Sequence, residues 1–194
     1  MPVINRGPSP QILSTYVFFD GGQMRSGLSD MGVAWQDVNL RQVAEIAINS
    51  VGRTWQGGNL TVSRVFIYDA VADNADPSTD AVERWLRRND DLPDVHVRRG
   101  RLVGSPLRQK GVDVQLAVDA LSFAANGIID AAILVAGDAD FAPVVEAIRE
   151  KGVLVGVCAF KAKLSERLRQ LADRTGILPD ETQAWAGWSL PPSV

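Results

Sequence analysis

The chain has 194 residues, of which 46% are hydrophobic and 22% are charged, the balance of an ordinary globular protein. Twenty Lys and Arg residues against 23 Asp and Glu residues give a net charge of −3, which excludes a polybasic coat. A single Cys and a single His exclude a disulfide scaffold, a zinc cluster and a catalytic group built from several such residues. Carboxylates are abundant, so if the protein carries out chemistry we expect Asp side chains to do it.

The two ends of the chain differ from its middle. The first ten residues hold three prolines and a glycine, and we expect residues 1–12 to be a flexible lead-in. They contain no apolar core of a secretory signal, and no apolar run reaches the roughly 20 residues of a membrane span. We therefore expect a cytoplasmic protein without a membrane partner. Residues 13–178 are predicted to form one domain, and residues 179–194 a tail whose Trp185 and Trp188 pack on the body or on a second copy in a homodimer.

Along the domain, short runs of β-branched and aromatic residues alternate with stretches of helical spacing. The predicted strands are Thr15–Phe19, Val62–Tyr68, Val95–Val97 with Leu102–Val103, Ala131–Ala136 and Val153–Val157. The predicted helices are Val38–Asn49, Asp80–Arg88, Asp113–Ala125, Phe141–Lys151 and Leu164–Arg174. This alternation predicts the α/β class, with three α/β/α layers around a mostly parallel sheet of about five strands. Runs that are apolar at consecutive positions indicate strands buried on both faces.

The first candidate site residue ends the first predicted strand. Asp20 follows an apolar run and precedes two glycines. This position is of interest because parallel sheets bind their ligands at the carboxyl ends of the strands. Because a buried strand cannot hold an unpartnered carboxylate, and glycines permit close approach of a ligand, we favour a functional role over a simple turn. Asp69, at the end of the second predicted strand, either faces the rim of the site or, as the more economical interpretation, belongs to a turn.

Two further acidic motifs occur at the same expected edge. Asp138 and Asp140 follow the strand Ala131–Ala136; Asp138 is interpreted as functional, and Asp140 as a helix N-cap, a site residue or both. Asp113 opens a helix and lies near the strand ends. Asp119 lies roughly 240° further around that helix, so we expect it to cap, to form a salt bridge or to support the site from behind.

Converging carboxylates repel one another unless a cation neutralises them. Ligation by Asp oxygens suits Mg²⁺ or Mn²⁺ rather than zinc. A site of this kind favours phosphoryl chemistry, in which the ion polarises the phosphate and generates the attacking hydroxide.

A basic segment immediately precedes Asp113. Residues 95–111 contain five basic residues and no acid, whereas residues 69–94 contain eight acids and three arginines. We expect the basic segment to hold the phosphates of a polyanion, with marked salt dependence. The alternative is a solvated hairpin whose arginines pair with the acidic stretch. The basic residues are Arg98, Arg99, Arg101, Arg108 and Lys110.

A resemblance to a known family is carried by four segments: FFDGG, KGVDVQLAVDAL, AAILVAGDADFAPVVEAIREKG and LSERLRQLAD. In this order they resemble the motifs of the NYN-domain family, LabA-like, among the PIN-like nucleases, over about Tyr16 to Ile177. The resemblance implies a PIN-like fold, a divalent-metal site and endonucleolytic cleavage of RNA. Carried over by position, it assigns the acidic cluster to Asp20, Asp113, Asp138 and Asp140. The family often has Asn three residues after the first Asp, where this chain has Gln23, which we place among the substrate-binding residues with Arg98, Arg99, Arg101 and Lys110.

Two functions from different classes remain open. The first is a metal-dependent endoribonuclease that cleaves single-stranded RNA with Mg²⁺ or Mn²⁺. The second is an RNA-binding regulatory module of the same fold with weak or no turnover. Gln23 and the negative net charge favour the second, whereas the complete set of four aspartates favours the first. The sequence lacks the glycine-rich phosphate loop of nucleotide hydrolases.

Overall fold

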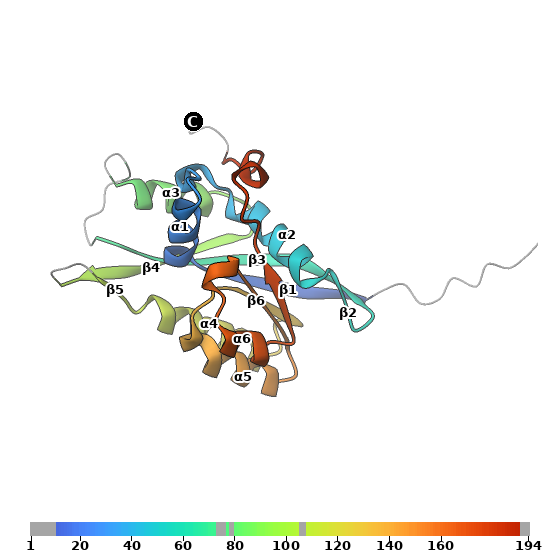
Figure 1. Ribbon diagram of the computed structural model, residues 1–194. Coiled ribbons are helices and arrows are strands. Elements are labelled where there is room, and N and C mark those ends of the chain that lie inside the picture. The colour runs from blue at the N-terminus through green and yellow to red at the C-terminus, as the bar shows by residue number, and fades with distance from the viewer. Residues whose placement is uncertain (1–10, 73–76, 78–79, 105–107, 191–194) are drawn as a thin grey trace, which may run out of the picture.

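A central parallel sheet organises the molecule (Figure 1). The computed structural model describes residues 11–72, 77, 80–104 and 108–190. The strands of this described part are β1 (Gln11–Asp20), β2 (Thr54–Trp55), β3 (Gly58–Val71), β4 (Val95–Val103), β5 (Arg108–Lys110), β6 (Ala131–Val135), β7 (Leu154–Ala159) and β8 (Arg174–Ile177). Their order across the sheet is β5-β4-β3-β1-β6-β7-β8, and β2 pairs with β3. All neighbours are parallel except β2–β3 and β4–β5, which are antiparallel.

Helices cover both faces of this sheet, which gives three layers. The helices are α1 (Gly21–Asp30), α2 (Leu40–Val51), α3 (Ala81–Asp90), α4 (Val112–Ala125), α5 (Ala142–Glu150) and α6 (Glu166–Leu171). The short 3₁₀ turns are η1 (Trp35–Asp37), η2 (Ala139–Phe141), η3 (Lys161–Lys163) and η4 (Thr182–Trp185). In Figure 1, α1, α2 and α3 lie above the sheet, and α4, α5 and α6 lie below it. The predicted α/β/α class is therefore confirmed.

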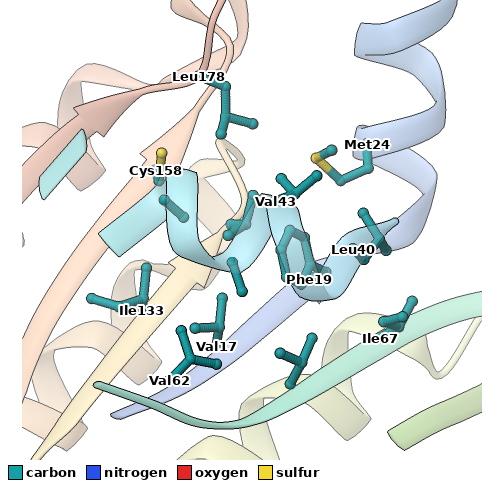
Figure 2. Close-up of a cluster of buried hydrophobic side chains, with 14 of the residues drawn as sticks. Val17, Phe19, Met24, Leu40, Val43, Val62, Ile67, Ile133, Cys158 and Leu178 are labelled. Atoms are coloured by element: carbon teal, nitrogen blue, oxygen red, sulfur yellow. The ribbon is translucent and has the colours of Figure 1, made fainter. Parts of the chain in front are cut away.

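The sheet separates two apolar cores, and β1 contributes to both. Val17 and Phe19 point into the core beneath α1 to α3, whereas Phe18 points into the core above α4 to α6. Figure 2 shows the first of these cores, in which Phe19 lies close to Leu40 and Val43 of α2. Burial on both faces explains why the strand is apolar at consecutive positions. The polar end of β1 is thereby left at the carboxyl edge, where Asp20 stands.

The sheet is larger than predicted, since the described residues form eight strands rather than about five. β2 and β5 have two and three residues, too few for a pattern of alternation to be recognised in the sequence. β8 includes Arg174 and Thr175, polar residues at the edge of the sheet. β4 runs without interruption through its basic residues, because its outer part pairs with β5.

Two helix predictions need correction. The segment that follows Asp20 forms α1, although it starts with two glycines and was not among the predicted helices. Helix α6 ends at Leu171, three residues before the predicted Arg174, because the chain turns there into β8. The other four predicted helices occur with ends displaced by up to two residues.

The tail returns across the layer of α1 to α3. The backbone N–H of Leu190 donates to the carbonyl of Asp37 at 2.6 Å, and that of Asn39 donates to the carbonyl of Trp188 at 2.8 Å. Trp185 is buried. Residues 1–10 of the expected lead-in and residues 191–194 of the tail lie outside the described part, whereas Gln11 and Ile12, also expected in the lead-in, begin β1 and pair with β3. No helix in the described part has the length and apolar character needed to cross a membrane.

Candidate functional site

Asp20 is a buried carboxylate at the junction of β1 and α1. It is the N-cap of α1, and its Oδ1 accepts a hydrogen bond of 2.9 Å from the backbone N–H of Gln23. Only 6% of Asp20 is exposed. Burial raises the pKa of Asp20 to about 6; the hydrogen bond from Gln23 opposes the shift, and the charges of Asp113, Asp69 and Asp138 add to it. Asp20 therefore lies within the electrostatic field of carboxylates from three other elements.

Asp138 and Asp140 stand where β6 ends. Asp138 is the N-cap of η2, and its side chain accepts a hydrogen bond of 3.0 Å from the backbone N–H of Asp140. The cap that the sequence assigned to Asp140 is thus formed by Asp138, because a 3₁₀ turn precedes α5. Asp140 lies in the first turn of η2, and its side chain is exposed.

Asp113 lies in the first turn of α4, as expected. Burial raises the pKa of Asp113, and the charges of Asp138 and Asp140 raise it further. The structure therefore brings Asp20, Asp113 and Asp138 to the same edge of the sheet, close enough for their charges to interact. Across the described ranges, however, no group of three or more His, Cys, Asp or Glu side chains is arranged tightly enough to hold a metal ion. Joint ligation of one ion stays a prediction.

Gln23 joins helix α1 to the loop that follows β6. Its side-chain Oε1 accepts a hydrogen bond of 2.7 Å from the backbone N–H of Gly137, the residue before Asp138. A side chain at Gly137 would collide with the backbone carbonyl of Lys163, so the loop passes very close to η3. Gln23, which was expected among the substrate-binding residues, thus uses its amide oxygen to hold the backbone beside Asp138.

Asp69 lies close to Asp20, and its interpretation as part of a turn is wrong. It lies within β3 rather than in a turn, and it is fully buried. Arg25 of α1 donates to both of its oxygens, at 2.7 and 2.9 Å, and Gln109 of β5 donates at 3.1 Å. A Cβ added to Gly21 would lie 2.8 Å from the Cβ of Asp69, so only glycine fits beside it. The sequence offered one signal, an Asp next to a strand end, but nothing that paired it with Arg25.

The basic segment is divided between the two faces of β4. Arg98 points toward α4 and forms an ion pair of 3.3 Å with Asp119. Arg99 points toward α3 and forms ion pairs of 2.9 Å with Glu83 and 3.5 Å with Asp90. The alternation of side chains along a strand causes this division. Acids from other elements therefore compensate part of the basic segment, and for Arg99 these acids belong to the acidic stretch named in the alternative interpretation.

Asp119 supports this arrangement from α4. Besides Arg98, it accepts hydrogen bonds of 2.9 Å from the hydroxyl of Tyr68 and 2.8 Å from the side chain of Gln115. Its expected salt bridge is therefore confirmed. The partners of Asp119 come from β3, β4 and α4, so it fixes the strand that carries the basic residues to the helix that carries Asp113.

A cleft of about 410 Å³ opens between β4, β5 and the start of α4. We call it the basic cleft; its lining includes Arg98, Arg99, Arg101, Lys110, Gly111 and Val112. Arg101 and Lys110 are opposite each other in the antiparallel pair of β4 and β5. The side chain of Arg108 lies outside the described part. The basic cleft thus leads to the helix start that bears Asp113.

Comparisons with known proteins bear on the family and the fold of this chain. A family model described as the NYN domain matches residues 14–178. A crystal structure of a protein of unknown function from Vibrio parahaemolyticus has a similar fold, with a TM-score of 0.59 and 20% sequence identity, over 90% of this chain and 98% of that chain. No curated protein matches this chain.

The matched region includes all four aspartates of the expected cluster and stops before the tail. A domain of this nuclease-like family supports a ribonuclease-type role. The fold likeness supports the three-layer arrangement alone, because the sequence identity is low. The chain belongs to the NYN domain family.

Proposed function

We propose that the protein is a metal-dependent endoribonuclease that cleaves single-stranded RNA at the edge formed by Asp20, Asp113, Asp138 and Asp140. The observation that carries this proposal is the gathering of carboxylates from three separate elements around the buried Asp20. Family membership supports the reaction class. RNA as substrate and dependence on a metal ion are our additions.

The donor set fits a hard divalent cation. All four side chains offer carboxylate oxygens, the ligands that Mg²⁺ and Mn²⁺ prefer. Carboxylates gathered without a compensating charge repel one another, and a cation between them would relieve this repulsion. Asp20, Asp113 and Asp138 would hold the ion, with Asp140 beside them, and when bound it would polarise the phosphate and activate the attacking water. Movements of the side chains must bring the carboxylates together, since the described residues hold no preassembled group of three.

The chain itself fixes the direction of these carboxylates. The backbone N–H of Gln23 holds one oxygen of Asp20, and that of Asp140 holds one oxygen of Asp138. The hydrogen bond from Gly137 to Gln23 joins the first turn of α1 to the loop that precedes Asp138. Such hydrogen bonds orient a ligand before binding and lower the cost of assembling the site.

The substrate approaches a protein of net charge −3, so it needs a local positive surface. We assign this role to the basic cleft, whose Arg98, Arg99, Arg101 and Lys110 would contact phosphates on either side of the scissile bond. Contacts of this kind carry little sequence information and depend strongly on salt. Arg98 and Arg99 would share their charge with Asp119, Glu83 and Asp90.

An RNA-binding module without turnover is the second candidate. Two observations favour it. Within the described residues the acidic side chains do not form a group of three that could hold a metal ion, and the amide oxygen of Gln23 already accepts a hydrogen bond from Gly137. The basic cleft would serve such a module equally well.

Incubation with end-labelled single-stranded RNA in Mg²⁺, Mn²⁺ or EDTA separates the two candidates. We expect internal cleavage in either metal, none in EDTA, and loss of cleavage in Asp138→Asn with RNA binding retained. Glu150→Gln, an exposed carboxylate at the end of α5, is the matched control and should cleave normally. Retained RNA binding without metal-dependent cleavage by the parent protein would support the binding module, and equal cleavage by Asp138→Asn would contradict the assignment of that residue.

A further inference from the structure

A second cleft lies at the end of α1 that is remote from Asp20. It has a volume of about 400 Å³, and we call it the tail cleft. Its lining includes Gly27, Asp30, Met31, Phe160, Lys161 and Asp180. These residues come from the end of α1, the segment after β7 and the tail. Asp180 lies beyond residue 178, where the match to the NYN domain ends, so the cleft is completed by a part of the chain that the family model does not cover.

The floor of the tail cleft is apolar and held in place from behind. A Cβ at Gly27 would overlap the ring of Phe160, so this ring lies directly against the backbone of α1. Trp185 of the tail packs on Phe160 with a distance of 6.0 Å between ring centroids. The tail is fixed there by the hydroxyl of Thr182, which donates to the carbonyl of Met31 at 3.0 Å. A preformed apolar floor with a few polar groups at its rim is typical of a small-ligand site.

The rim of the tail cleft carries charges of both signs. Lys163 is occupied, since it forms an ion pair of 2.8 Å with Asp30 and donates to Ser26 at 3.0 Å. Asp180 and Lys161 are exposed, and within the described residues no hydrogen bond or ion pair engages either side chain. The cleft therefore offers one free carboxylate acceptor and one free cation at the edge of an apolar floor.

The tail cleft is connected to the proposed cleavage site through α1. Asp20 caps this helix and Gly27 lies seven residues further on, which corresponds to about 10 Å along the helix axis. The small cavity of about 10 Å³ that is lined by Gln23 and Phe160 cannot admit a nucleotide. A nucleotide next to the scissile phosphate would therefore reach the tail cleft over the outer surface of α1.

We propose that the tail cleft binds a nucleobase of the RNA strand and prefers bases that carry an exocyclic amino group. The apolar floor accommodates the flat base, as proteins do when they recognise unstacked bases of single strands. The Asp180 carboxylate accepts from the amino group of adenine, cytosine or guanine, which uracil lacks. Lys161 contacts the phosphate of the same nucleotide. This inference rests on the proposed function, because a strand bound at the acidic edge is what delivers the base.

Nucleoside monophosphates test the cleft without requiring cleavage. AMP and UMP are titrated into the metal-free, isotopically labelled full chain, and the amide resonances of Gly27, Met31 and Ala162 are followed. We expect both nucleotides to shift these resonances, and AMP to bind roughly three- to tenfold more tightly, the contribution of one hydrogen bond. In Asp180→Ala the preference for AMP should disappear, whereas Glu181→Ala, its exposed neighbour outside the cleft lining, should retain it.

A second variant tests the space itself. Ala162 is exposed and lines the tail cleft, so Ala162→Phe should fill the cleft without disturbing the core. The affinities for AMP and for UMP should then both fall at least fivefold. Equal affinities for AMP and UMP, or shifts confined to the basic cleft around Val112, would overturn the inference. If AMP is preferred but the protein cleaves no RNA, the proposed function fails while the nucleobase site stands. If RNA is cleaved but neither nucleotide shifts the cleft residues, the nucleobase site fails alone.

Discussion

The side-chain oxygen of Gln23 and the backbone N–H of Gly137, 114 residues apart in the chain, form a hydrogen bond of 2.7 Å. This bond joins the first turn of α1 to the loop that follows β6. It lies between the two carboxylates whose separation matters most, because Asp20 caps the helix and Asp138 follows the loop. The relative position of the proposed ligands therefore depends on a neutral side chain.

Gln23→Ala should loosen this connection. We expect the free energy of unfolding to fall by about 1 kcal/mol, the usual contribution of one hydrogen bond, and the affinity for Mn²⁺ to fall as well. Chemical denaturation and calorimetric titration with Mn²⁺ measure the two effects. Gln170→Ala on α6, where the side chain donates to Glu166 and to no other described residue, is the control and should leave Mn²⁺ affinity unchanged. Unchanged affinity in Gln23→Ala would show that the bond does not position the acids.

The pair formed by Arg25 and Asp69 should be important for stability. Asp69 is fully buried, so Arg25→Met leaves an uncompensated charge and should lower the free energy of unfolding by roughly 3 kcal/mol or more. Adding Asp69→Asn removes that charge and should restore part of the loss. Urea denaturation of the two single variants and the double variant gives the coupling energy. Purely additive effects would contradict a direct interaction between the two side chains.

The buried Asp20 should make the metal-free protein less stable as pH rises. A carboxyl group whose pKa is raised to about 6 in the folded state binds its proton more tightly there than in the unfolded chain. The stability it contributes is present below the unfolded pKa near 4 and is lost as pH rises through about 6. Asp20→Asn can keep the N-cap without the charge, so its advantage over the parent should grow from little near pH 4 to roughly 3 kcal/mol at pH 7.

Denaturation in EDTA at both pH values measures this difference. The comparison between variant and parent cancels the other titrating groups, which are common to both proteins. A constant difference across the range would mean that Asp20 ionises in the folded state as it does in the unfolded chain.

The two sides of the basic segment should contribute unequally to RNA binding. Lys110 is exposed beside the basic cleft, whereas Arg99 is paired with Glu83 and Asp90. We expect Lys110→Ala to weaken the binding of RNA of every sequence and to reduce the salt dependence of that affinity by about one phosphate contact. Arg99→Ala should have a smaller effect on both quantities. Binding of single-stranded RNA in EDTA at several salt concentrations measures both slopes. Equal slopes for Lys110→Ala and the parent would exclude this side chain from the interface.

The sequence predicted the parts of the fold that depend on long, regular patterns. The central strands are buried on both faces, and runs such as Val17-Phe18-Phe19 show this directly. Helix α1 was missed because its glycines and polar residues have low helix propensity, and packing of Met24 and Leu28 against the sheet stabilises it instead. β8 was missed because an edge strand lacks the continuous apolar run of its neighbours.

The candidate site was predictable only where residues lie at strand ends or at a helix start. Asp20 and Asp138 could be assigned to one edge because parallel strands end there, and Asp113 because it begins a helix near those strand ends. The partners of Asp69 and Arg98 could not be predicted, because each depends on side-chain direction across elements distant in sequence. The same holds for the tail cleft, which is formed by three segments that meet only in the folded chain.

The most direct test of the central claim is the position of Mn²⁺ in crystals of the protein soaked with that ion, located by its anomalous scattering. We expect one strong peak within ligand distance, about 2 to 2.5 Å, of carboxylate oxygens from Asp20, Asp113 and Asp138, and its loss in Asp138→Asn. Mn²⁺ bound elsewhere, or no peak between these residues while RNA is still cleaved, would contradict the account.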